Sequence, residues 1–271
     1  MKEALTHLKV IARDAAGIGR VCGWLVALRW IGCIAWTLPL CRRSANLQPA
    51  DRLMGDGPFL VRRGSARARL TGVQVFSGIR EIWVRDVYLK GDYLRVPPGA
   101  LVVDFGANLG NFTALALAQH SNVRAVAVEP RLSLLRNVEE SARLNGWSTR
   151  LIVKRAFVGL STKAQAGEAD NPDYLGAPFL TEQQFLDELQ IKHIDFLKCD
   201  IEGSEFFMIE PDSRLLSIAD HLAIEIHEWG GSVPRFLEYL RNVGFDIGSV
   251  VRDGTGSCIA LCRRPTTART A

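Results

Sequence analysis

The chain has 271 residues, of which 48% are hydrophobic and 23% charged, an ordinary globular composition that excludes a disordered, collagen-like or coiled-coil protein. Its length is enough for one large domain with an appendage or for two small domains. The net charge of +4 hides an asymmetry. Residues 1–95 hold 16 Lys and Arg against 7 Asp and Glu, whereas residues 96–271 hold 17 against 22. The first third is therefore basic and the rest acidic, a difference that requires a physical explanation.

The cysteine pattern bears on the compartment. The six cysteines form no C-x-x-C pair and no metal-like cluster with histidine. Cys199 lies in the apolar run Phe196-Leu-Lys-Cys199, where a buried thiol is more common than a disulfide. A chain without a disulfide framework is typical of a reducing compartment, so we predict a cytoplasmic protein.

Residues 21–40 form an apolar stretch that is nearly long enough to span a bilayer. Arg29 lies near its middle, and a central arginine costs about 2.5–3.5 kcal/mol on insertion. Flanking basic residues and interspersed tryptophans are typical of a helix in the lipid headgroup region. We therefore predict that residues 1–45 form an apolar, basic, amphipathic helix that contacts the inner face of the membrane peripherally. Packing of this helix on the domain and a true membrane span stay open as alternatives.

Residues 46–98 are predicted to form a linker followed by a small antiparallel lead-in. The stretch 44–57 is polar and contains proline and glycine, which favours a linker. Short apolar runs separated by glycines follow and predict strands. These runs lie at residues 59–62, 68–75 and 81–84.

Residues 99–265 alternate between short apolar runs and helical segments, and residues 266–271 form a tail. The predicted strands are 101–105, 123–128, 151–153, 194–199 and 221–226, followed by a hairpin of 245–251 and 258–262. The predicted helices are 111–119, 132–144, 182–189 and 233–243. Strands that alternate with helices require crossover connections, so we predict an α/β fold with a mostly parallel, Rossmann-like sheet and an antiparallel last strand. Ligands of such a sheet bind at the carboxyl ends of its strands.

The first of these strands runs into a glycine turn that opens a helix. Gly106 and Gly110 allow the backbone to bend sharply and approach a ligand. Asn108, which tolerates left-handed geometry, occupies the position where a bound pyrophosphate requires bare backbone. The turn therefore favours a ligand without a pyrophosphate.

Two carboxylates accompany this turn. Asp104 ends the first strand, where it can reach an ammonium group or fix the loop. Glu129 ends the next strand, where an acid typically accepts hydrogen bonds from ribose hydroxyls. An adenosine without a diphosphate and with an ammonium group nearby indicates S-adenosylmethionine. The alternative is that both acids cap helices or are solvated.

Four segments, VVDFGANLGNFT, VAVEP, IDFLKCDIEGSE and IEIHEW, resemble the FkbM-type methyltransferases and occur in that family's order. The resemblance covers about residues 75–262. It implies a class I methyltransferase fold, S-adenosylmethionine as cofactor, and O-methylation of hydroxyls on sugars, glycolipids or polyketide-type small molecules. The cofactor-binding residues predicted on this basis are Asp104, Gly106, Ala107, Asn108, Gly110, Asn111 and Glu129. The segment 156–160 departs from many relatives, which place a polar residue there near the adenine.

Acids and a histidine follow the fourth and fifth predicted strands, which should be neighbours. Methyl transfer to a hydroxyl requires a base that removes its proton, and histidine titrates near working pH. We therefore predict His227, Asp200 and Glu202 as catalytic residues, and Glu225 and Glu205 as substrate-binding residues. A carboxylate pair that holds Mg²⁺ or Ca²⁺ stays open, as do structural roles for the histidine and for acids at a helix start.

Other functions stay open at this stage. A nicotinamide-dependent oxidoreductase has the same strand-turn-helix plan, although Asn108 counts against it. A non-catalytic, membrane-associated module that binds a nucleoside or sugar is the other alternative. We do not expect a nucleic-acid partner, because the arginines at 62, 63, 67 and 69 have no interleaved aromatic residues.

A motif similar to a methyltransferase signature precedes the fourth predicted strand. Asn171-Pro-Asp-Tyr174 is similar to the N-P-P-[YF] signature of amino-group methyltransferases. It lacks the second proline and precedes the fourth strand instead of following it, so we predict a turn. The surrounding loop, residues 159–179, is expected to help shape the substrate pocket.

Overall fold

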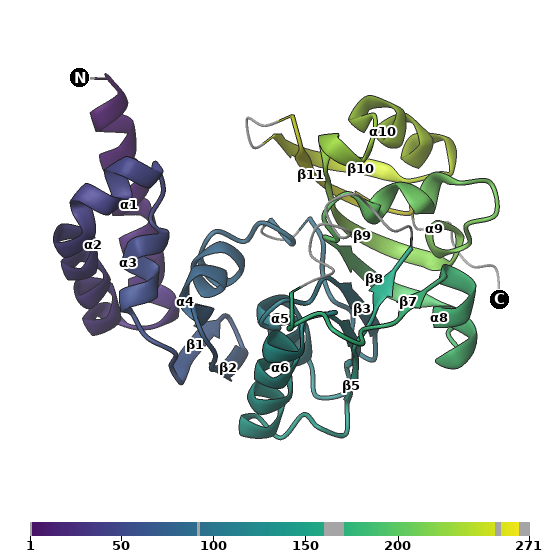
Figure 1. Ribbon diagram of the computed structural model, residues 1–271, viewed down its shortest axis with the longest axis horizontal. Coiled ribbons are helices and arrows are strands. Elements are labelled where there is room, and N and C mark those ends of the chain that lie inside the picture. The colour runs from purple at the N-terminus through teal and green to yellow at the C-terminus, as the bar shows by residue number, and fades with distance from the viewer. Residues whose placement is uncertain (1, 91–92, 160–170, 253–255, 266–271) are drawn as a thin grey trace.

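The computed structural model describes residues 2–90, 93–159, 171–252 and 256–265 (Figure 1). The predicted tail 266–271 and most of the predicted pocket loop lie outside these residues. The six cysteines are free thiols, as expected for a chain without a disulfide framework.

A seven-stranded sheet forms the centre of the molecule, in the order β10-β11-β9-β8-β3-β4-β5. Its strands are β3 (Leu101–Phe105), β4 (Arg124–Val128), β5 (Leu151–Lys154), β8 (Ile194–Cys199), β9 (Ala219–Ile226), β10 (Asp246–Arg252) and β11 (Cys258–Arg263). Strands β3, β4, β5, β8 and β9 pair in parallel, and β11 is antiparallel to both of its neighbours. The predicted α/β fold with an antiparallel last strand is therefore confirmed.

Both faces of this sheet are covered, because alternate residues of each strand point to opposite sides. On one side, Val102 and Phe196 pack with the core of the N-terminal helices, α5 (Asn111–Gln119) and α6 (Leu132–Leu144). On the other side, Val103 and Leu197 pack with α8 (Glu182–Glu188) and α10 (Val233–Asn242) (Figure 1). Burial on both faces explains why these strands are continuous apolar runs in the sequence.

Short elements complete the two layers. They are β6 (Phe157–Val158), which pairs with β7 (Phe179–Leu180), together with α9 (Leu215–Ile218) and the 3₁₀ segments η2 (Ser204–Ile209) and η3 (Glu228–Gly230). The strand order places the switch point between β3 and β8, whose carboxyl ends therefore lie side by side.

The N-terminal region differs in part from the prediction. It comprises α1 (Lys2–Val21), α2 (Trp24–Ser44), α3 (Gln48–Leu53), β1 (Phe59–Arg63), β2 (Ala66–Leu70), α4 (Val75–Gly78) and the π-helical segment η1 (Ile79–Val84). The stretch predicted as a linker contains α3, because Pro49 stands in the first turn of that helix, where proline is favourable. The antiparallel hairpin is present. Residues 81–84 are helical and not a strand, because η1 continues α4 and buries Ile79 and Trp83 on one side.

A buried ion network attaches the N-terminal helices to this lead-in. Asp51 in α3 accepts hydrogen bonds from the Trp30 indole at 2.8 Å and from the Arg80 guanidinium at 2.6 Å. Arg80 also pairs with Asp14 of α1 at 3.1 Å, and Arg85 pairs with the same carboxylate. Both aspartates are almost completely buried, so the network joins α1, α2 and α3 to η1 inside the protein.

We expect Asp51→Ala to lower the free energy of unfolding by about 3–5 kcal/mol, because it leaves the Arg80 charge buried with half of its partners. Guanidinium chloride denaturation measures the difference. Asp56→Ala is the matched control, since Asp56 is an exposed acid on the same segment and its replacement should leave the stability unchanged. Equal stability of the two variants would contradict the structural role of the network.

Candidate active site

A buried lysine supports the glycine turn that follows β3. The Lys198 ammonium of β8 lies 3.2 Å from a carboxylate oxygen of Asp104 and donates to the carbonyls of Phe105 and Gly106 at 3.2 and 2.7 Å. Burial lowers the pKa of Lys198, but the charges of Asp104 and Asp200 outweigh it and raise the pKa to about 12. Asp104 is fully buried and also accepts a hydrogen bond from the Thr113 hydroxyl at 2.6 Å. The carboxylate predicted to reach a ligand ammonium thus binds the ammonium of the protein's own lysine.

The turn itself packs directly on the end of β8. A Cβ atom added to Gly106 would lie 1.7 Å from the Asp200 carbonyl oxygen, and the φ angle of Gly106 is 72°. Only glycine fits this combination of left-handed backbone and close approach. Asn108 is also left-handed, with φ at 51°, as its residue type permits.

A cavity of about 310 Å³ opens beside this turn. Three of the seven predicted cofactor residues line it, namely Gly106, Asn108 and Glu129. The other lining residues are Phe105, Val128, Pro130, Arg131, Leu134, Ala156, Phe157, Val158, Tyr174, Asp200, Ile201 and Glu202. The apolar segment after β5 therefore forms part of the wall, at the place where the sequence departs from many relatives.

Glu129 joins the glycine turn to the segment that leads into α6. One carboxylate oxygen accepts a hydrogen bond from the Asn108 backbone N–H at 2.9 Å, and the other accepts one from the Arg131 N–H at 3.0 Å. Burial raises the pKa of Glu129, and these backbone hydrogen bonds oppose the shift. The side chain is thus fixed in place before any ligand binds.

Asp104 and the three other predicted cofactor residues lie outside the cavity lining. Ala107 is buried against the sheet, and Gly110 precedes α5 with φ at 73°. Asn111 faces the lead-in, where its backbone carbonyl accepts a hydrogen bond from the Trp83 indole at 3.2 Å. These three residues shape the turn, and the structure does not place them against the cavity.

Four predicted site residues do converge at the carboxyl ends of β8 and β9. The Nε2 atom of His227 lies 3.8 Å from an oxygen of Asp200, 3.9 Å from one of Glu202 and 3.8 Å from one of Glu225. We call these four residues the rim cluster. Asp200 and Glu202 also line the cavity, so the rim cluster borders the space beside the glycine turn.

Glu205 lies beneath the rim cluster and not in it. It is fully buried and accepts a hydrogen bond from Nδ1 of His227 at 2.7 Å. The same oxygen accepts the backbone N–H groups of Ile201 and Gly203 at 3.1 and 3.2 Å. The residue predicted to bind substrate is therefore placed to orient His227.

The electrostatics of the rim cluster reflect its crowded carboxylates. Burial and the charge of Asp200 raise the pKa of Glu225 to about 7, although His227 opposes the shift. Burial lowers the pKa of His227, but its hydrogen bond to Glu205 and the nearby carboxylate charges raise it to about 9. Burial and the charge of Asp200 also raise the pKa of Glu202. The group as a whole therefore attracts positive charge.

Sequence reasoning missed three contributors to this site. The Tyr88 hydroxyl donates a hydrogen bond to Asp200 at 3.2 Å, although it comes from the lead-in, where no motif marks it. Trp229 packs against the imidazole of His227 with ring centroids 4.5 Å apart, and 58% of its surface is exposed. Lys198 did carry a signal, because a lysine inside an apolar strand requires a buried partner.

The segment 171–174 forms a turn, as predicted, but it also contributes to the cavity. Tyr174 lines the cavity and stacks on Phe157 with ring centroids 5.4 Å apart. Asp173 accepts a hydrogen bond from the Ser133 backbone N–H at 2.8 Å, which fixes the turn to the start of α6.

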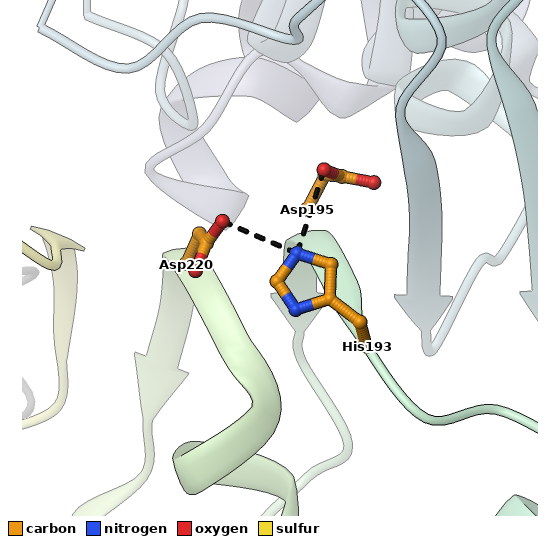
Figure 2. A group of neighbouring side chains, drawn as sticks. All are labelled: His193, Asp195 and Asp220. Carbon is orange, nitrogen blue, oxygen red and sulfur yellow. Dashed lines mark ion pairs between the residues drawn. The ribbon is translucent and has the colours of Figure 1, made fainter. Parts of the chain in front are cut away.

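A second group of potential ligands lies at the opposite end of the sheet (Figure 2). His193 Nε2 is 3.2 Å from Asp220 and 3.5 Å from Asp195, at the amino ends of β8 and β9. Asp195 also accepts the Leu101 backbone N–H at 2.7 Å. These partly exposed side chains form ion pairs far along the strands from the glycine turn.

Several solved structures are similar to this chain. A solved METTL16 methyltransferase domain has a TM-score of 0.45 and 14% identity over 73% of each chain. The precorrin-6y C5,15-methyltransferase from Geobacter metallireducens has a TM-score of 0.44 and 14% identity, over 68% of this chain and 88% of that one. Aeropyrum pernix fibrillarin, solved with S-adenosyl-L-methionine, has a TM-score of 0.41 and 16% identity, over 65% and 71%.

Sequence comparison identifies the family. The AMB antimetabolite synthetase AmbE of Pseudomonas aeruginosa is 24% identical over 224 residues, which covers 62% of this chain and 10% of that protein. The chain thus spans about a tenth of the length of this relative. A family model described as the methyltransferase FkbM domain matches residues 104–247, more than half of the chain. Counted along the chain, the sheet order is 3-2-1-4-5-7-6 with strand 7 antiparallel, the Rossmann-like sheet of class I methyltransferases. The chain therefore belongs to the FkbM methyltransferase family.

Proposed function

We propose that this methyltransferase transfers the methyl group of S-adenosylmethionine to a hydroxyl on a sugar, glycolipid or polyketide-type small molecule. The observation that carries the proposal is the rim cluster, a buried histidine among three carboxylates at the edge of the cavity beside the glycine turn. A hydroxyl must lose its proton when it is methylated, and the carboxylates of this cluster are proton-accepting groups. The family match favours this function over the nicotinamide oxidoreductase and the non-catalytic module.

The cavity fits the cofactor by its size and by the chemistry of its walls. When bound, S-adenosylmethionine supplies a methyl group on a positively charged sulfur. Glu129 retains acceptor capacity for ribose hydroxyls, because each of its oxygens accepts only one backbone N–H. The apolar wall of Leu134, Ala156 and Val158 suits the adenine ring. Asp200 and Glu202, shared by the cavity and the rim cluster, would hold the acceptor hydroxyl next to the cofactor.

We expect calorimetry with S-adenosylhomocysteine to show a single site in the wild-type protein. Glu129→Ala should weaken it by about 1–3 kcal/mol, because the variant loses ribose hydrogen bonds and the backbone contacts that shape the turn. Glu139→Ala, which removes an exposed acid on α6, is the matched control and should bind normally. Absence of wild-type binding would contradict the proposed cofactor site.

The acceptor class is tested by the transfer of a labelled methyl group to polysaccharide or glycolipid extracts. We expect the wild-type protein to catalyse this transfer and Glu225→Gln to catalyse it more slowly.

We also propose that α2 brings the protein to an anionic membrane surface. Its inward stripe, Ala27, Trp30, Ile34, Thr37 and Cys41, is buried on the protein. Its outward face exposes large apolar side chains, which include Trp24, Leu25, Leu28 and Trp36 at 63%, 84%, 64% and 81%. Soluble helices carry polar residues on that face.

The charges on α2 support a lipid partner. The helix contains no acid, and Arg29, Arg42 and Arg43 are exposed alongside the apolar face. Arginines beside exposed tryptophans match the headgroup region of an anionic bilayer. By length and composition α2 could cross a membrane. A span would separate Trp30 from the buried Asp51, so we propose that α2 lies in the membrane plane on the cytoplasmic side.

We expect the full-length protein to float with phosphatidylglycerol vesicles and not with phosphatidylcholine vesicles. The double variant Leu25→Glu/Trp36→Glu should bind at least tenfold more weakly, since two large apolar side chains are lost from the contact. Leu60→Glu on β1, where the leucine is 62% exposed, is the matched control and should bind like the wild type. Unchanged binding of the double variant, or dimerisation through α2 without lipid, would contradict the membrane contact.

A further inference from the structure

No hydrogen bond joins Nε2 of His227 to the carboxylates of the rim cluster. Its three distances of 3.8 to 3.9 Å between His227 Nε2 and carboxylate oxygens are too long for hydrogen bonds. Within the part of the chain that the structure describes, Nε2 has no other partner, although only 4% of this side chain is exposed. A ring nitrogen of a nearly buried histidine is therefore aimed at several carboxylates without touching any of them.

The orientation of the imidazole is fixed from behind. Glu205 accepts the Nδ1–H at 2.7 Å and is itself held by the backbone N–H groups of Ile201 and Gly203. Once the proton on Nε2 is lost, Glu205 holds the remaining proton on Nδ1, and the lone pair of Nε2 points into the cluster. A carboxylate behind a histidine is the arrangement that orients metal-ligating histidines in proteins.

We propose that Asp200, Glu202 and His227 bind a divalent cation of the first transition series, such as Mn²⁺, at the acceptor side of the cavity. Their ligand atoms lie within 4.8 Å of one another. Two atoms 3.8 Å apart can both bind one cation at about 2.1 Å with a wide angle between them. One nitrogen and several carboxylate oxygens suit Mn²⁺ or Zn²⁺ better than Ca²⁺, which takes oxygen ligands only.

This inference rests on the proposed function and specifies how the acceptor is activated. A cation held by these residues would supply Lewis-acid chemistry, which would lower the pKa of the acceptor hydroxyl. The oxygen forms its bond to the methyl carbon as the carbon–sulfur bond breaks, with the electron pair going to sulfur. The hydroxyl proton passes to Glu225, whose carboxylate faces the same position and is not needed as a ligand. Glu205 is a positioning residue, because it acts through His227.

The test uses metal-free, full-length protein titrated with Mn²⁺ and followed by the loss of the free Mn²⁺ signal in electron paramagnetic resonance. We expect one Mn²⁺ per chain in the wild type and in His193→Ala, the matched control from the second group of ligands. Glu202→Gln removes a ligand from a mostly exposed side chain and should weaken binding without affecting folding. Glu205→Gln should weaken binding about 10–100-fold, as loss of an orienting partner does.

The outcomes separate this inference from the proposed function. Equal Mn²⁺ binding by wild type and Glu202→Gln, or loss of binding in His193→Ala, would overturn the assignment of the ligands. S-adenosylhomocysteine binding and methyl transfer that persist unchanged in EDTA, without Mn²⁺ binding, would overturn the cation site and leave the methyltransferase intact. One bound Mn²⁺ that depends on Glu202, in a protein that binds no S-adenosylhomocysteine, would support the cation site and contradict the proposed function.

Discussion

One buried ammonium group, that of Lys198, joins the two strands on which the site is built. It holds Asp104 and the carbonyls of Phe105 and Gly106 at the end of β3, and it lies 3.9 Å from Asp200 at the end of β8. A charge taken out of water requires such partners, and here the partners are Asp104, the backbone of the glycine turn and an acid that lines the cavity. The glycine turn and the end of β8, which both border the cavity, are thus fixed to one ammonium group.

Much of this fold could be predicted from the sequence, because buried parallel strands are continuous apolar runs and their bounds are set by glycine and proline. The convergence of Asp200 and His227 followed from the expectation that their strands are neighbours, and the order of the sheet confirms this. Burial of Glu205 could not be predicted, because an acid at the start of a short helix has the same sequence pattern whether it faces solvent or a histidine. The helical state of η1 depends on its packing against α1 and α5, which is a tertiary contact and not a local preference.

Part of the positive charge of the N-terminal third is paired inside the protein, which its composition does not indicate. Arg80 and Arg85 are partners of buried aspartates, so part of the positive charge lies inside the protein and stabilises it. Other arginines, such as Arg42 and Arg43 at the end of α2, are exposed. The lead-in also takes part in the site, since Tyr88 contacts Asp200. The N-terminal region therefore contributes a side chain to the site as well as ion pairs to the protein interior.

The turn that contains Asp173 has a consequence for how the cavity can change its shape. The glycine turn is held by a buried charge and by a backbone contact that tolerates only glycine, whereas the opposite side of the cavity is a turn tied to α6 by polar side-chain contacts near the surface. Replacement of that turn would alter the shape of the cavity and leave the support beneath the glycine turn untouched. The shape of the cavity and the support of the glycine turn thereby depend on parts of the chain that can diverge separately.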